Sequence, residues 1–163
     1  MKIRKLTALS SAVGRNDVGR IEALCAEELE VEPIDIMALI ILADSYWRNE
    51  QLEKALPPAL DALEVDPNEF YALRIVTSIY ATRGEHQLAY RYAKRMLNVN
   101  PLTFPPTKAV SRILTPFAWL AKARRLKERV TRDELEIKIS YSEWAQWARD
   151  YVSWYEASLP TAP

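Results

Sequence analysis

Two consecutive stretches decide the fold: residues 36–69 read IMALIILADSYWRNEQLEKALPPALDALEVDPNE, and residues 70–103 read FYALRIVTSIYATRGEHQLAYRYAKRMLNVNPLT. A fixed period of 34 residues indicates that one supersecondary unit is stacked on copies of itself. The sequence therefore predicts an all-α repeat array. Nine positions are identical at this offset without an insertion: Ala38/Ala72, Leu39/Leu73, Ile41/Ile75, Tyr46/Tyr80, Ala55/Ala89, Ala59/Ala93, Leu63/Leu97, Val65/Val99 and Pro67/Pro101.

Each copy is predicted to be a helix, a turn and a second helix. In the first of these stretches, apolar residues at spacings of three and four predict a helix over 36–47, and 49–51 form the turn. A second helix is expected over about 53–65, where Pro57 and Pro58 predict a delayed start or a slight kink. In the next copy Asn68 is the expected N-cap, Gly84 supplies a left-handed residue, and a helix follows over 85–99.

Residues 2–35 are interpreted as a degenerate first copy. Leu29, Glu30, Val31 and Pro33 match the end of the next copy, and Cys25 falls where Ala59 stands. The match is poor in the first half of this segment. A terminal repeat has one neighbour instead of two, so its pattern is expected to drift.

These copies resemble the tetratricopeptide repeat family, which has small residues where paired helices approach closely, an aromatic between units and a proline at the end. The resemblance implies a right-handed α-solenoid of about three repeats over residues 1–103, with units 2–35, 36–69 and 70–103. The matching positions are Leu39, Leu42, Ala43, Tyr46, Ala55, Ala59, Ala62 and Pro67, then Leu73, Val76, Thr77, Tyr80, Ala89, Ala93, Met96 and Pro101.

Residues 104–163 do not continue the repeat, and they are expected to form C-terminal capping or interaction helices. Helices are predicted over 107–114, 117–129 and 141–158, with possible capping boxes at Thr131/Glu134 and Ser140/Glu143. Between them, apolar residues at 135, 137 and 139 alternate with charged ones, which fits either a strand or a short helix. The helix at 107–114 is the candidate that covers the last repeat, with the final helix folded back against it.

Composition favours no charged partner. The chain of 163 residues has 22 basic and 22 acidic side chains and a single cysteine, so it has no global preference for nucleic acid and no internal disulfide. The N-terminal segment is too polar for a secretory signal, and no apolar run is long enough to cross a bilayer. We expect a soluble, cytoplasmic protein without membrane insertion.

Enzyme chemistry is not expected, and neither is a cofactor or a metal site. His86 aligns with Leu52 at a turn between helices, which favours a solvated or packing role over catalysis. Cys25 aligns with two core alanines and has no identifiable general base nearby, so it is interpreted as a small core residue.

The resemblance implies that the first helix of each pair lines a concave groove. Most residues expected to be exposed there are apolar or aromatic, which favours a protein or peptide partner, although the chain's own C-terminal helix is an alternative occupant. Arg74 is left available for one anionic group on a ligand. The expected groove positions are Leu6, Met37, Ile40, Asp44, Trp47, Tyr71, Arg74 and Ser78.

Two further surfaces are candidates for contacts. An aromatic stripe formed by Trp144, Trp147, Tyr151 and Trp154 packs as core or forms a homo-oligomer or partner surface. A basic cluster over 122–132 is usually a solvated helix face, and it is the only feature that favours nucleic acid or an anionic surface. The expected function is a non-catalytic interaction adaptor or chaperone-like module, reminiscent of three-repeat bacterial secretion chaperones.

Overall fold

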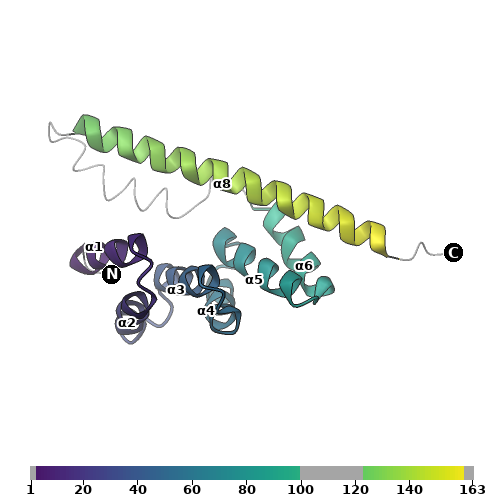
Figure 1. Cartoon of the computed structure of the whole chain (residues 1–163), viewed down its shortest axis with the longest axis horizontal. Coiled ribbons are helices and arrows are strands. Elements are labelled where there is room, and N and C mark those ends of the chain that lie inside the picture. Colours follow the sequence, from purple (N-terminus) through teal and green to yellow (C-terminus); the bar gives the residue numbers. More distant parts are fainter. Residues whose placement is uncertain (1–2, 100–122, 160–163) are drawn as a thin grey trace. The chain divides into compact units, whose positions relative to one another are not determined.

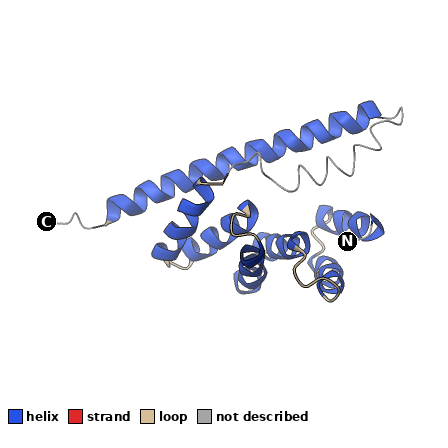
Figure 2. Ribbon diagram, turned by 180° about the vertical axis from the view of Figure 1, so that it is seen from behind, coloured by secondary structure: helices blue, strands red, loops and turns tan. Residues whose placement is uncertain are grey.

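The computed structural model describes residues 3–99 and 123–159, with side chains described over 8–99 and 141–159. Every regular element within these residues is a helix (Figure 2), so the chain is all-α as predicted. Contacts divide the chain into two compact units, residues 1–96 and 97–163, which are treated separately below. The helices are α1 (Ile3–Gly14), α2 (Val18–Leu29), α3 (Ile36–Arg48), α4 (Leu52–Val65), α5 (Phe70–Thr82), α6 (His86–Leu97) and α8 (Ala123–Ser158).

In the first unit the helices pack in chain order (Figure 1). Helix α1 packs on α2, α2 on α3, and α3 on both α4 and α5, so neighbouring pairs also contact each other. Helix α6 contacts α5 through the stacked rings of Tyr80 and Tyr92, whose centroids lie 5.7 Å apart. Consecutive helices therefore form antiparallel pairs joined by short turns, as the period predicts.

The same turn occurs three times at intervals of 34 residues. Asn16, Glu50 and Gly84 each adopt a positive φ, of 52°, 58° and 74°. The residue after each of them donates its backbone N–H to the carbonyl five positions earlier, as in Gln51 to Tyr46 at 2.9 Å. The first copy therefore keeps the turn conformation of the other two, although its sequence has drifted.

Neighbouring turns are also tied together by side chains. The amide groups of Asn16 and Asn49 donate to each other at 3.0 and 3.1 Å, and Asn49 also donates to the carbonyl of Ser45 at 2.8 Å. This pair links the α1–α2 turn to the α3–α4 turn. Such a reciprocal bond fixes the spacing of the first two helix pairs at their exposed ends.

Most of the predicted core positions are buried, whereas Leu42 and Tyr80 are half-buried. Thr77, which stands where the family has a small residue, donates its hydroxyl to the carbonyl of Leu73 at 2.6 Å, so its polar group is satisfied. The alanines allow close approach of the paired helices. Buried residues at equivalent positions include Cys25, Ala59 and Ala93, then Ile21, Ala55 and Ala89, and then Leu39 and Leu73.

Two local predictions are wrong. Helix α4 begins at Leu52 and runs through Pro57 and Pro58, so of the two effects predicted for these prolines the delayed start is wrong. The N-cap of α5 is Glu69, whose carboxylate accepts from the N–H of Ala72 at 2.5 Å, whereas Asn68 donates its own N–H to Asp66. Glu69 stands 34 residues after Asp35, which caps α3 in the same way.

In the second unit, α8 is one continuous helix of 36 residues. The predicted break between 129 and 141, with new starts at Thr131 or Ser140, is therefore wrong, and residues 133–140 are helical. The predicted helix over 107–114 and the start of the one at 117 lie outside the described residues. Within this unit the hydroxyl of Tyr141 on α8 donates to the carbonyl of Val99 at 2.9 Å.

Candidate functional site

The predicted groove residues that the structure describes lie on α3 and α5, which pack against each other. Large apolar side chains on this surface remain half-buried instead of fully covered. Leu6 belongs to the same prediction, but its side chain lies outside the described ones. We call this surface the α3–α5 face and define it by Met37, Ile40, Asp44, Trp47, Tyr71, Arg74 and Ser78.

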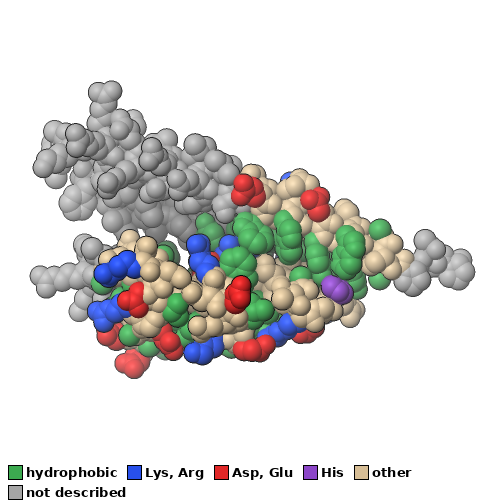
Figure 3. Space-filling model, in the orientation of Figure 1, with side chains coloured by type: hydrophobic (Ala, Val, Ile, Leu, Met, Phe, Trp, Pro, Cys, Tyr) green, Lys and Arg blue, Asp and Glu red, His purple; other side chains and the backbone are tan. Residues whose placement is uncertain are grey.

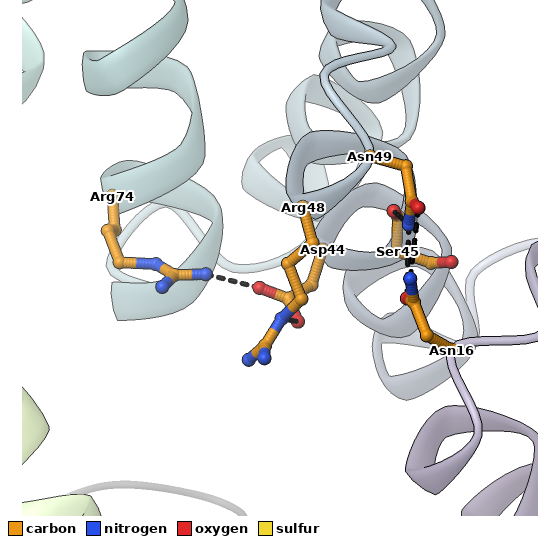
Figure 4. Close-up of polar contacts among 6 residues, drawn as sticks. All are labelled: Asn16, Asp44, Ser45, Arg48, Asn49 and Arg74. Atoms are coloured by element: carbon orange, nitrogen blue, oxygen red, sulfur yellow. Dashed lines mark hydrogen bonds and ion pairs between the residues drawn. The ribbon is translucent and has the colours of Figure 1, made fainter.

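An ion pair lies at the centre of the α3–α5 face (Figure 4). The guanidinium of Arg74 on α5 donates to Oδ1 of Asp44 on α3. The other carboxylate oxygen of Asp44 accepts from Nε of Arg48 at 2.5 Å, one helical turn further along α3. Asp44 is thus shared by two arginines, of which Arg48 is the exposed one.

Two aromatic rings lie beside the guanidinium of Arg74. Its Cζ atom is 4.6 Å from the ring centroid of Trp47 and 5.7 Å from that of Tyr71. A cation held over an aromatic face within about 6 Å is attracted by the ring quadrupole, and the attraction strengthens when water is excluded. Burial also raises the pKa of the Tyr71 hydroxyl. Rings, cation and carboxylate together form one packed cluster.

The expected exposure of Arg74 is wrong. Its residue is only 5% exposed, because Asp44 and the two rings enclose its charged group. Arg74 is therefore a buried part of the α3–α5 face, and its guanidinium is not open to bind an anion. The side chains that remain partly open around it are apolar or aromatic: Met37, Ile40, Trp47 and Tyr71.

Sequence reasoning missed Glu69, which caps α5 two residues before Tyr71. The residue is 2% exposed, and its Oε1 atom is buried without a hydrogen-bond partner within the described part of the chain. Burial raises the pKa of Glu69 to about 7, against the opposing effect of the backbone N–H groups of Ala72 and Tyr71. The capping role of Glu69 could have been predicted from its alignment with Asp35, because aspartate is a common N-cap residue.

One of the two predictions for the aromatic stripe of α8 was that it is buried as core. The structure differs from this prediction. Trp144, Trp147 and Tyr151 are half-buried, and Trp154 is 51% exposed. Successive rings along the stripe have centroids 5.5 Å apart at each step, so the side chains pack on one another. The buried face of this part of α8 is a different one, made of Ala145, Ala148 and Val152.

One group of acidic residues could offer oxygen ligands to a metal ion. Carboxylate oxygens of Glu28, Glu32 and Asp35 lie within 4.8 Å of one another between α2 and α3. However, Asp35 already accepts the N–H of Ala38 as the cap of α3. Of the three side chains Glu28 is buried, Asp35 is half-buried and Glu32 is exposed, and we assign no metal site to them.

The remaining candidate for chemistry is Cys25, which is 0% exposed. Burial, reinforced by the charge of Asp35, raises the pKa of its thiol to about 11. A buried thiol that stays protonated at neutral pH is a core residue and not a nucleophile. The basic cluster over 122–132 lies outside the described side chains.

No protein family model matches the sequence, and neither does any curated protein. None of the helices in the described residues combines the length and apolar character needed to cross a membrane.

Proposed function

We propose that residues 1–103 form three tetratricopeptide-type repeats in a right-handed solenoid, and that the chain is a non-catalytic interaction adaptor or chaperone-like module. The threefold recurrence of one turn, at Asn16, Glu50 and Gly84, supports the repeat. So does the coincidence of buried small residues at equivalent positions of successive helix pairs. The α3–α5 face is the proposed binding surface.

The observation that carries this proposal is the half-buried state of large apolar residues on the first helices of consecutive pairs. Met37, Ile40 and Trp47 on α3 and Tyr71 on α5 are half-buried, and the rings of Trp47 and Tyr71 lie beside Arg74 of the ion pair. Apolar and aromatic side chains grouped on a surface are typical of protein-binding sites. Because Arg74 is buried against Asp44, the proposed ligand is an apolar or amphipathic protein segment and not a free carboxylate.

A non-catalytic binding function agrees with the burial of Cys25. Its thiol is enclosed between α1, α2 and α3, among the side chains of the first core cluster. The raised pKa keeps it protonated at neutral pH. The proposed activity is therefore recognition of a partner, with affinity set by the apolar side chains around the ion pair.

The test compares two matched substitutions. Ile40→Asp places a charge on the α3–α5 face, whereas Ile34→Asp places it at a 64% exposed isoleucine in the loop before α3. The full chain captures partners from the native cell, and a defined segment of an identified partner is then titrated calorimetrically. We expect Ile40→Asp to weaken binding at least about tenfold.

Ile34→Asp should bind as the wild type does, and thermal melts of both variants verify that the fold is retained. A partner segment that binds wild type and a folded Ile40→Asp variant equally well would remove the α3–α5 face from consideration. Loss of binding in both variants would likewise argue against a specific surface on α3 and α5.

A further inference from the structure

Arg48 is the last residue of α3, and it lies beside the α3–α5 face without being one of the positions predicted for that face. Its Nε atom donates to Oδ2 of Asp44 at 2.5 Å, while its side chain remains 62% exposed. The terminal nitrogens of Arg48 point away from Asp44 (Figure 4). A guanidinium has several N–H donors in a planar fork. Arg48 can therefore keep its contact with Asp44 and donate to a second acceptor at the surface.

The ion-pair network around Asp44 has a surplus of positive charge. Two guanidiniums, of Arg48 and Arg74, share this one carboxylate, which leaves a net charge of +1. The side chain of Arg74 is 6% exposed and that of Arg48 is 62% exposed, so the surplus is accessible at Arg48. Glu69 also acts on Arg74, but burial raises the pKa of Glu69 to about 7. Below that pH its carboxyl is mostly neutral and does not cancel the surplus.

Apolar side chains lie on the same side of α3 as Arg48. Intervals of three and four residues place four side chains along this side of the helix: Met37, Ile40, Asp44 and Arg48. Met37 and Ile40 are half-buried. Met37 precedes Arg48 by about three helical turns, which is about 16 Å along the helix axis. One side of α3 is thus apolar at its beginning and cationic at its end.

A ligand that follows this side of α3 meets charge as well as apolar surface. On the side of the molecule drawn in Figure 3, the hydrophobic side chains of the first unit lie scattered among charged ones. A wholly apolar ligand that covered Arg48 would remove its guanidinium from water without replacing the lost hydrogen bonds, which costs free energy. A carboxylate on the ligand would accept from the exposed N–H groups instead. Charge complementarity therefore favours an acidic side chain at this end of the ligand.

We propose that the ligand of the α3–α5 face is an amphipathic protein segment with an acidic side chain, and that this side chain pairs with Arg48. The assignment rests on the proposed function, because it gives the chemistry of the ligand for the same surface. The apolar side chains of the segment pack on Met37 and Ile40, and its carboxylate lies at the end of α3. Arg48 thus takes the anion-binding role that the sequence predicted for Arg74.

The probes are peptides selected on the full chain from a phage-displayed library of random segments of about 15 residues, which are long enough to follow α3. They are resynthesised with an acetylated N-terminus and an amidated C-terminus, so that side chains supply every carboxylate. Peptides that no longer bind the folded Ile40→Asp variant occupy the α3–α5 face. Calorimetry at about pH 6, where Glu69 is mostly protonated, measures the effect of changing each acidic residue of such a peptide to its amide. We expect one acidic position whose change weakens binding at least about fivefold.

Variants of Arg48 identify the partner of that acidic side chain. Arg48→Gln should bind the acidic peptide about fivefold more weakly than wild type, and should distinguish the acidic and amide peptides by less than about twofold. Arg48→Glu should bind a peptide with lysine at this position better than the acidic one, because the charges are exchanged. Arg91→Gln removes an exposed arginine of α6 and is the matched control, which should behave as wild type. Thermal melts verify that every variant is folded.

The outcomes separate this proposal from the proposed function. A library that yields no peptide, or only peptides that bind folded Ile40→Asp as well as wild type, would contradict the proposed function itself. Peptides that depend on Ile40 but show no preference for an acidic residue would overturn the acidic ligand alone. So would an equal gain from glutamate at every position, which indicates unspecific attraction. An acidic preference that keeps its full size in Arg48→Gln would overturn the assignment to Arg48.

Discussion

Arg74 of α5 is held by Asp44 of α3, a residue 30 positions earlier in the chain and in the preceding helix pair. The pair is asymmetric, because the side chain of Arg74 is 6% exposed and that of Asp44 is 22% exposed. Asp44 also has Arg48 as a second partner. The contact therefore joins two consecutive helix pairs. We expect stability to depend more on the carboxylate of Asp44 than on the guanidinium of Arg74.

This asymmetry predicts unequal effects of removing each partner. Asp44→Ala removes a carboxylate that pairs with a buried guanidinium and should lower the free energy of unfolding by about 3 kcal/mol. Arg74→Met leaves Asp44 with Arg48 and a more exposed position, so it should cost less, about 1 kcal/mol. Urea denaturation of both variants measures the difference.

The double variant Asp44→Leu/Arg74→Met is the control for this prediction. It removes both charges and keeps the volume, so it should lie within about 1 kcal/mol of the wild type. Equal losses for the two single variants would contradict the geometry described for this ion pair.

Glu69 predicts a pH-dependent stability of unusual sign for a carboxylate. Its pKa rises from 4.5 to about 7 on folding, chiefly because of burial. The folded chain thus binds a proton that the unfolded chain has already released, and stability falls as the pH rises from about 4.5 to about 7. The corresponding change in the free energy of unfolding is about 3 kcal/mol.

The measurement compares wild type with Glu69→Gln, since other carboxylates also titrate in acid. Glutamine stays neutral, so the free energy of unfolding of wild type relative to the variant should decrease through this pH range and level off above it. A difference that is flat, or that increases with pH, would show that Glu69 is ionised in the folded chain.

The repeated turn predicts opposite effects at equivalent positions. Glu50 holds a φ of 58°, which a residue with a Cβ atom adopts at a cost, so Glu50→Gly should stabilise the chain by up to about 1 kcal/mol. Gly84→Ala should destabilise it by about 1 kcal/mol through the backbone alone, because an added Cβ would meet no atom within 4 Å.

Gly19→Ala is the control for these turn variants. Gly19 lies within α2, and a Cβ there also meets nothing within 4 Å. Alanine should therefore stabilise this helix by about 0.5–1 kcal/mol through its higher helix propensity. Destabilisation at Gly19 as large as that at Gly84 would mean that the positive φ is not what matters.

The repeat made the fold of the first unit predictable from sequence. Each interior position was indicated more than once, so the burial of Ala59 is supported by Ala93 and by Cys25 at the same place in other copies. The left-handed turn was predicted only at Gly84, because glycine signals it and Glu50 does not. At Glu50 the positive φ is imposed by the packing of the neighbouring helices, so the residue type does not indicate it.

The misses share a physical cause, which is that local patterns do not reveal distant partners. Ser140 and Glu143 have the spacing of a capping box, but the same spacing also occurs inside a continuous helix, where no cap is needed. Arg74 was predicted to be exposed, yet it is buried and pairs with Asp44 in another helix pair. Whether the α3–α5 face binds a ligand stays a prediction, because ligand identity is not encoded in periodicity.

Cys25 gives the last prediction, which probes the packing of α2. With a pKa of about 11 the thiol is about one-thousandth ionised at pH 8, and its side chain is also shielded from reagents. Its reaction with a disulfide reagent should therefore be at least about 100-fold slower in the native chain than in urea. Because labelling requires α2 to open, the native rate measures local unfolding of the first helix pair. Comparable rates in both conditions would mean that Cys25 is not packed against α1 and α3.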